Sequence, residues 1–172
     1  MKIVILNGSG RANGNSRAFA DSFKKGAESK GHAVETLNVG SMRINGCIGC
    51  EGCHKLGKGC VQKDDMEKVY SAIEDADMVV FTSAVHYWGL TGQLESAITR
   101  FYAMPGMKPK AMKYALILSS GSEGVYDGIV SQYKDMVGYF GAESLGIKTV
   151  AGEGDQKTEG NLRAMFEFGA SV

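Results

Sequence analysis

Residues 7–16 combine glycine, serine, asparagine and arginine in a pattern suited to binding a phosphate. A short apolar run at residues 2–6 comes directly before them and is typical of a strand buried on both faces. A helix is expected to follow, with Asn15 or Ser16 as its N-cap. Loop N–H groups, serine hydroxyls, the Arg11 charge and the positive end of a helix all favour an anion at one point. The segment therefore predicts a phosphate-binding loop.

The spacing of the glycines separates this loop from two familiar nucleotide motifs. A nucleoside-triphosphate loop needs Lys and then Ser or Thr after its last glycine, whereas Gly14 is followed by Asn15 and Ser16. A dinucleotide fingerprint reads G-x-G-x-x-G, whereas Gly8, Gly10 and Gly14 give G-x-G-x-x-x-G. An ordinary surface turn is the alternative, and the position directly after a buried strand disfavours it.

Four cysteines within residues 47–60 form the second group that suggests chemistry. The spacing C-x2-C-x2-C-x6-C is made by Cys47, Cys50, Cys53 and Cys60. Thiols at two successive short intervals let a loop wrap one face of an iron–sulfur cubane, whereas zinc sites usually use two separated C-x2-C pairs. Free thiols that act as small buried hydrophobes are the alternative. Both interpretations stay open.

The apolar pattern predicts the elements that position these two segments. Strands are expected at residues 2–6, 33–39, 78–84, 113–119 and 144–150, with helical periodicity after each. The last helix is expected to bury Leu162, Met165 and Phe166. Alternating strands and helices predict an α/β fold with a parallel sheet covered on both faces. We expect one domain over residues 1–172, in which residues 41–63 form a cysteine-rich insertion without regular structure.

Ligands of such sheets bind beyond the carboxyl ends of the strands, where three loops are expected to meet. Residues 7–16 would hold a phosphate, residues 85–90 supply flat aromatic rings, and residues 120–124 are small enough to let a ring approach the backbone. FMN, a flat ring system with one phosphate, fits that layout. The expected contacts are Ser9, Gly10, Arg11, Asn13, Gly14, Asn15, Ser16, Ala84, Val85, His86, Tyr87, Trp88, Gly89, Ser120, Gly121 and Ser122. The cysteine-rich insertion leaves the second strand at the same edge.

Two of these loops resemble those of the flavodoxin-like NAD(P)H-dependent FMN reductases. The family's loop G-S-x-R-x-x-G-N-[ST] is matched by Gly8, Ser9, Arg11, Gly14, Asn15 and Ser16. Its second motif, S-P-V-Y-W-x-G-x-[ST]-[AG]-Q-[LM], is matched by Ser83, Val85, Gly89, Thr91, Gly92, Gln93 and Leu94. The family's motif continues as K-x-[FLI]-x-D-R, in which Arg100 matches. The chain departs from the whole motif at Ala84, His86, Glu95 and Thr99. The cysteine motif, followed by Asp64, Asp65 and Met66, resembles that of the iron–sulfur flavoproteins.

The resemblance implies a flavodoxin-like three-layer sandwich with strand order 2-1-3-4-5, FMN as cofactor and NADPH or NADH as electron donor. It implies an oxidoreductase that moves electrons from NAD(P)H or a reduced carrier to a quinone, a flavin or a redox protein. It also implies a [4Fe–4S] cluster on the four cysteines. The alternative is an iron–sulfur flavoprotein that relays electrons between ferredoxin and flavin without a small substrate of its own.

The charge and apolar composition limits the kinds of partner that we expect this protein to bind. Lys and Arg together number 19, as do Asp and Glu, so nothing favours nucleic acid or an anionic membrane surface. No apolar stretch approaches the roughly 18 residues of a membrane span, and residues 1–7 are too short for a signal peptide, so a cytoplasmic protein is expected. Tyr87, Trp88 and the apolar residues 101–107 predict a homodimer or homotetramer.

Overall fold

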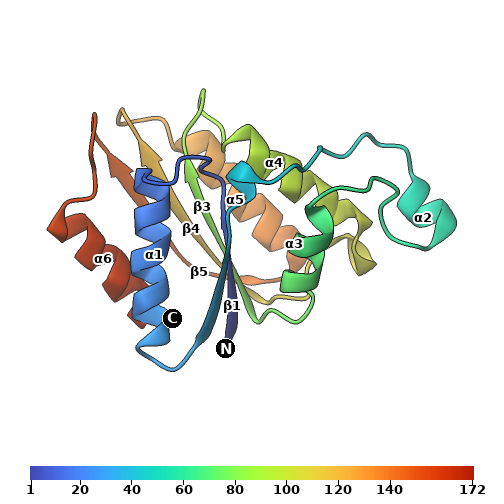
Figure 1. The fold of residues 1–172 in the computed structure, drawn as a ribbon, viewed down its shortest axis with the longest axis horizontal. Coiled ribbons are helices and arrows are strands. Elements are labelled where there is room, and N and C mark those ends of the chain that lie inside the picture. The colour runs from blue at the N-terminus through green and yellow to red at the C-terminus, as the bar shows by residue number, and fades with distance from the viewer.

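The computed structural model describes residues 1–172 as a five-stranded sheet with helices packed against it (Figure 1). All neighbouring strands are parallel, and their order is β2-β1-β3-β4-β5. The strands are β1 (Lys2–Asn7), β2 (Ala33–Leu37), β3 (Met78–Ala84), β4 (Lys113–Ser120) and β5 (Glu143–Ala151). This topology confirms the expected flavodoxin-like fold and strand order.

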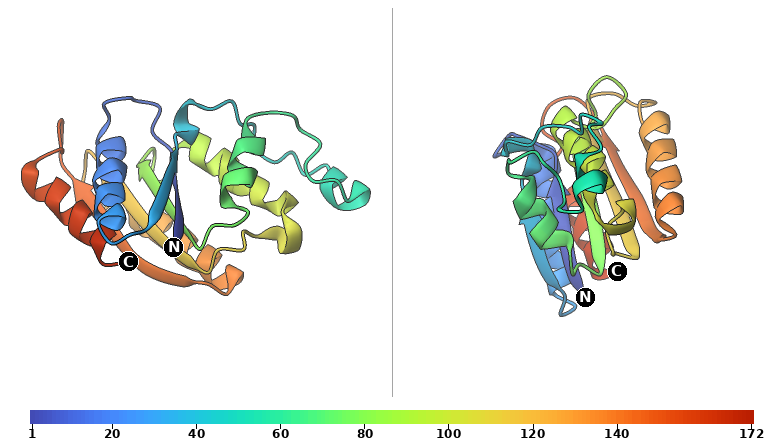
Figure 2. Two further views of the ribbon diagram at one scale, coloured as in Figure 1. Left: turned by 60° about the horizontal axis from the view of Figure 1, so that its bottom comes forward. Right: turned by 90° about the vertical axis from the view of Figure 1, so that its right-hand side faces the viewer.

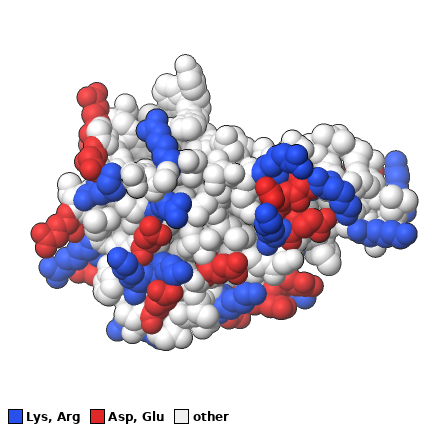
Figure 3. Space-filling view, in the orientation of Figure 1, with Lys and Arg blue, Asp and Glu red and all other residues white.

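Helices cover both faces of the sheet, as two further views show (Figure 2). One face carries α1 (Asn15–Glu28) and α6 (Glu159–Ala170). The other face carries α3 (Met66–Ile73), α4 (Gly92–Thr99) and α5 (Asp127–Phe140). None of these helices combines the length and the apolar character needed to cross a membrane. On the surface in Figure 3, basic and acidic side chains are intermixed, so neither sign of charge covers that face.

The two apolar cores follow from the alternation of side chains along each strand. Ile3 and Ile5 belong to the core under α1 and α6, whereas Val4 and Leu6 belong to the core under α3, α4 and α5. All four side chains are fully buried. A parallel strand that is covered on both faces needs apolar residues at successive positions, and this explains the unbroken apolar run.

Some local expectations were wrong. Phe166 is 39% exposed, and Phe168 takes its place in the core, with its ring centroid 5.3 Å from that of Phe23. Met165 and Phe168 are three residues apart and share one helix face, from which Phe166 is turned away. Residues 40–63 contain a short helix, α2 (Gly52–Leu56), although no periodicity marks it. Phe101 is buried rather than part of an exposed apolar loop.

Helices α1 and α6 are in backbone contact at two glycines. A Cβ atom added to Gly26 would lie 2.0 Å from the carbonyl oxygen of Phe166, and one added to Gly169 would lie 2.0 Å from that of Phe23. No side chain fits between these helices at either point. Gly138 in α5 differs, because no atom lies within 4 Å of a Cβ atom added there.

We therefore expect opposite effects from two glycine-to-alanine changes. Gly26→Ala should lower the free energy of unfolding by about 1–3 kcal/mol, because the added methyl group forces the two helices apart. Gly138→Ala should raise it by about 0.5–1 kcal/mol, because alanine is the better helix former where space is open. Equilibrium unfolding in urea measures both, and a Gly26→Ala protein as stable as Gly138→Ala would contradict the close contact.

Candidate functional site

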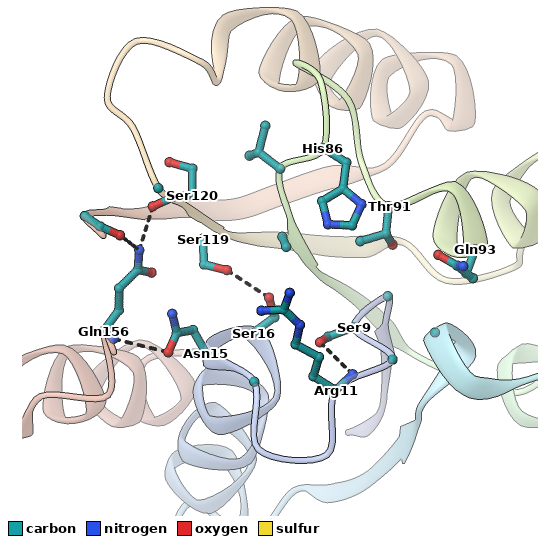
Figure 4. Close-up of a pocket in the computed structure, with 18 of the residues that line it drawn as sticks. Ser9, Arg11, Asn15, Ser16, His86, Thr91, Gln93, Ser119, Ser120 and Gln156 are labelled. Carbon is teal, nitrogen blue, oxygen red and sulfur yellow. Dashed lines mark hydrogen bonds between the residues drawn. The ribbon is translucent and has the colours of Figure 1, made fainter. Parts of the chain in front are cut away.

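A cavity of about 380 Å³ lies at the carboxyl ends of the strands, between the loops after β1, β3 and β4 (Figure 4). Eleven of the sixteen residues expected to bind FMN line it. These are Ser9, Gly10, Arg11, Gly14, Asn15, Ser16, Ala84, Val85, His86, Ser120 and Gly121. The sequence therefore predicted where the three loops meet.

The N-terminus of α1 opens into this cavity without a side-chain cap. Gly14, rather than Asn15 or Ser16, is the N-cap residue, and the first turn holds no acidic residue. Asn15 does not cap because its side chain donates to the Gly154 carbonyl at 3.1 Å and accepts from the Gln156 amide at 3.2 Å. Ser16 is instead hydrogen-bonded through its hydroxyl to that of Ser119 at 2.9 Å. The first N–H groups of α1 are thus available to an anion.

The loop after β1 is held in place from beneath by Asn7. This residue is fully buried, and its Oδ1 accepts from the Ser9 amide at 3.3 Å and from the Thr82 hydroxyl at 3.0 Å. Gly40 packs against the same loop, since a Cβ atom there would lie 2.4 Å from the Gly8 carbonyl oxygen and 2.5 Å from the Gly10 nitrogen. The loop therefore has little freedom to move before a ligand arrives.

Arg11 supplies the charge of the cavity. It is the one residue with a permanent charge in the lining, and it takes part in none of the protein's ion pairs. Figure 4 shows its side chain extending across the loop toward the side where Ser16 lies. A free guanidinium beside an uncapped helix N-terminus favours a phosphate at this end of the cavity.

Gln156, in the loop after β5, is a lining residue that the sequence pattern did not predict. It is 6% exposed, and its side-chain amide donates to the carbonyls of Ser120, at 2.6 Å, and Gly152. Its Oε1 is buried without a hydrogen-bond partner. A buried acceptor of this kind fits a ligand that brings an N–H or O–H donor. The topology could have indicated this residue, because the fifth parallel strand ends at the same sheet edge as the other strands and the loop after it therefore reaches the site.

Tyr87 and Trp88 lie outside the main cavity, at the tip of a tight turn. His86 and Gly89 close that turn with reciprocal backbone hydrogen bonds of 2.9 and 3.0 Å. The two aromatic residues between them have φ angles of 49° and 61°, a left-handed conformation that is strained for bulky side chains. They are 97% and 64% exposed, and with Ser122 they line an adjoining hollow of about 240 Å³.

Asn13 and Gly89 line neither the main cavity nor the adjoining hollow. The carbonyl of Asn13 accepts a hydrogen bond from the Lys157 ammonium group at 3.2 Å. Gly89 belongs to the turn that presents Tyr87 and Trp88. Both residues therefore shape loops that border the site.

The four cysteines lie at the other end of α4. Thr91 and Gln93, at the start of this helix, line the main cavity, whereas Thr99 at its end accepts a hydrogen bond from the Cys47 amide at 3.1 Å. The helix has eight residues, so its ends are about 12 Å apart. Although the cysteine segment (residues 41–63) leaves the carboxyl end of β2, it extends sideways away from the sheet (Figure 1).

The cysteines surround one small cavity. Cys47, Cys50, Cys53 and Cys60 all line it, and none of them forms a disulfide. No three Cys, His, Asp or Glu residues are grouped to hold a single metal ion. Tyr102 in the same wall donates to Glu51 at 2.9 Å, and this hydrogen bond raises the pKa of the Tyr102 hydroxyl. The structure thus places the four cysteine residues around one cavity of about 20 Å³ without forming a metal site.

An ion pair closes the base of the cysteine segment. Arg100 and Asp64 have side chains that are 1% exposed, and Nη1 of Arg100 donates to Oδ2 of Asp64 at 2.9 Å. Burial alone would raise the pKa of Asp64. The hydrogen bonds from Arg100 and from the amides of Asn45 and Met66 outweigh that effect and hold the pKa below its usual value. Asp64 is therefore ionised at neutral pH.

A parallel sheet of this order, with a glycine-rich loop between its first strand and first helix, defines a flavodoxin-like fold. The sequence profile of the NADPH-dependent FMN reductase family matches residues 1–156, and the chain belongs to that family. This is a family of oxidoreductases, and membership confirms the resemblance carried by the first two loops.

Proteins with sequences similar to this chain include several named iron–sulfur flavoproteins. One from Archaeoglobus fulgidus is 36% identical over 140 residues, which cover 81% of this chain and 60% of the relative. One from Methanocaldococcus jannaschii is 35% identical over 115 residues, which cover 66% of this chain and 57% of the relative. The chain thus spans less than two thirds of the length of these relatives.

Solved structures show the same fold at low sequence identity. The NAD(P)H:quinone oxidoreductase of Methanothermobacter marburgensis superposes with a TM-score of 0.74 at 18% identity, over 99% of this chain and 96% of the other. An FMN-dependent NADH-azoreductase of Bacillus anthracis, in complex with FMN, gives 0.69 at 15% identity, over 99% of each chain. At such identities the likeness concerns the fold.

Proposed function

We propose that this protein binds FMN in the main cavity and transfers electrons from NADPH, NADH or a reduced carrier to a small acceptor, such as a quinone, a flavin or a redox protein. The observation that carries the proposal is the uncapped N-terminus of α1 beside the unpaired Arg11. Membership of the NADPH-dependent FMN reductase family supports both the cofactor and the donor.

The cavity residues divide into two groups in this proposal. Ser9, Arg11 and the first turn of α1 would bind the phosphate, and Ala84–His86 and Ser119–Gly121 would flank the ring. The unpartnered Oε1 of Gln156 would accept from an N–H group of the ring system. FMN supplies the hydride and electron chemistry when bound, so the protein's task is to hold and orient it.

The cysteine cavity favours a second candidate function, an iron–sulfur flavoprotein that relays electrons between ferredoxin and flavin. Each iron of a [4Fe–4S] cluster takes one thiolate, so four thiols around one space match its donor set. The relatives from Archaeoglobus fulgidus and Methanocaldococcus jannaschii are named iron–sulfur flavoproteins, and these names support an iron–sulfur cluster in this protein. The cysteines would hold it through deprotonated sulfurs.

The first test concerns the phosphate. Arg11→Gln should weaken FMN binding by roughly 1.5–3 kcal/mol, or about 10- to 150-fold, because a charge-assisted phosphate contact is lost. Riboflavin, which has no phosphate, should bind both proteins equally. Arg163→Gln is the matched control, since this arginine lies on the exposed face of α6 with a side chain that is 77% exposed. Fluorescence titration measures all these affinities, and tight NADP binding without flavin affinity would overturn the proposal.

The second test separates the cysteine cavity from the flavin cavity. Cys53→Ser should lose iron after anaerobic reconstitution with ferrous iron and sulfide, yet bind FMN as the wild type does, because no cysteine lines the main cavity. Iron analysis and the visible spectrum give the two readouts. A wild-type protein that takes up no iron under these conditions would remove the cluster from the proposal.

The third test concerns assembly. Two strained and exposed aromatic residues at the rim of the site, Tyr87 and Trp88, support a homodimer or homotetramer whose partner covers them. Light scattering at micromolar concentration should give at least a dimer, and replacing both residues with serine should shift it toward monomer. A wild-type monomer with FMN bound would contradict this.

A further inference from the structure

His86 is the one histidine that lines the main cavity, and histidine is the side chain whose charge ordinarily changes near neutral pH. The lining holds no carboxylate, lysine, tyrosine or cysteine, and its permanent cation, Arg11, does not give up a proton. The other polar side chains there are neutral hydroxyls and amides. A proton transfer from the wall of this cavity therefore falls to the imidazole of His86.

The imidazole of His86 is free to interact with a ligand, in contrast to those of the other two histidines. Nδ1 of His32 lies 3.1 Å from the amino nitrogen of Met1, and its Nε2 lies 2.9 Å from an oxygen of Val172. His54 belongs to α2, outside the main cavity. The ring of His86 instead projects from the loop after β3 into the cavity (Figure 4), where it forms no hydrogen bond with the protein.

His86 stands where the main cavity borders the adjoining hollow. Val85, Ser120 and Gly121 line both spaces. Reciprocal backbone hydrogen bonds with Gly89 hold the backbone of His86 in place. The shared residues are those proposed to flank the flavin ring, so a planar molecule that enters from the hollow would reach the ring beside His86.

Reduction of a quinone needs a proton that hydride transfer does not supply. Two electrons and one proton leave NADPH or NADH as a hydride, and the quinone receives them through the bound cofactor. A second proton must then reach a quinone oxygen to complete the hydroquinone. An imidazolium can donate this proton, and the exposed position of His86 lets the ring take a proton back from water. A redox protein that accepts single electrons needs no such donor.

We propose that His86 is a catalytic residue that protonates an oxygen of a quinone-type acceptor as the hydride arrives. This inference rests on the proposed binding of FMN in the main cavity, and it selects a proton-accepting small molecule as the substrate. Arg11 shares the lining with His86, and Tyr87 follows it in the turn. Helix α4, the end of β4 and the loop after β5 contribute only neutral side chains to the lining.

The test compares His86→Gln with wild type and with His54→Gln, a matched control at an exposed histidine outside the cavity. Glutamine keeps a hydrogen-bonding side chain but does not release a proton. Each protein is loaded with FMN, reduced anaerobically with dithionite and mixed with one of two acceptors. Duroquinone needs protons, and its fully substituted ring does not add to the free thiols. Ferricyanide takes one electron and no proton.

His86→Gln should be reoxidised by duroquinone roughly 100- to 10,000-fold more slowly than wild type, and by ferricyanide at the same rate. With duroquinone, the rates of wild type and His54→Gln should fall as the pH rises, because only the protonated imidazole is a donor, whereas the rate of His86→Gln should stay nearly constant.

A duroquinone rate that is unchanged in His86→Gln, or a loss that is equal with both acceptors, would overturn the role of His86 and leave FMN binding standing. A wild-type protein that binds FMN and reduces ferricyanide but not duroquinone would overturn the choice of substrate. A wild-type protein that binds no FMN would overturn the proposed function, and the role of His86 with it.

A binding measurement decides the placement of the imidazole even if His86→Gln does not fold. Protein labelled with carbon-13 in histidine gives imidazole signals from three residues. Addition of FMN should shift the signal that persists in both His32→Gln and His54→Gln, and that signal should still titrate with pH in the complex. A signal of His86 that FMN does not move, or that does not titrate with FMN bound, would overturn the proposal.

Discussion

The N–H groups at the start of α1 are the feature on which the main cavity depends. They stay available because the two residues best suited to cap them are committed elsewhere, Asn15 to Gly154 and Gln156 and Ser16 to Ser119. These contacts tie α1 to the end of β4 and to the loop after β5. The same hydrogen bonds that leave the helix end open therefore also place the opposite walls of the cavity.

Helix α4 sets the distance between the main cavity and the cysteine segment. Its first turn lines the main cavity, and the residues at its end, Thr99 and Arg100, hold the cysteine segment. An ion pair buried at that junction is costly to form but more costly to break, because either partner alone would be an unpaired buried charge. The separation of the two cavities is thus fixed by a short, well-anchored helix.

Much of this arrangement could be predicted from local sequence. The apolar runs locate the five strands because both faces of a parallel sheet are buried, and Gly8, Gly14 and Arg11 mark a loop that does line the main cavity. Contacts between residues far apart in the sequence could not be predicted from local sequence patterns. Gln156 reaches the site through a partner 141 residues away in sequence, Asn15, and the sideways course of the cysteine segment depends on Arg100, 55 residues after Asn45.

A crystal structure of the protein grown anaerobically with FMN would test whether the main cavity holds FMN with its phosphate at the start of α1. We expect the phosphate beside Gly14 and Arg11, and the ring between Val85 and Ser120 with a donor facing Oε1 of Gln156. A phosphate bound elsewhere, or a flavin whose ring occupies the α1 end, would contradict it.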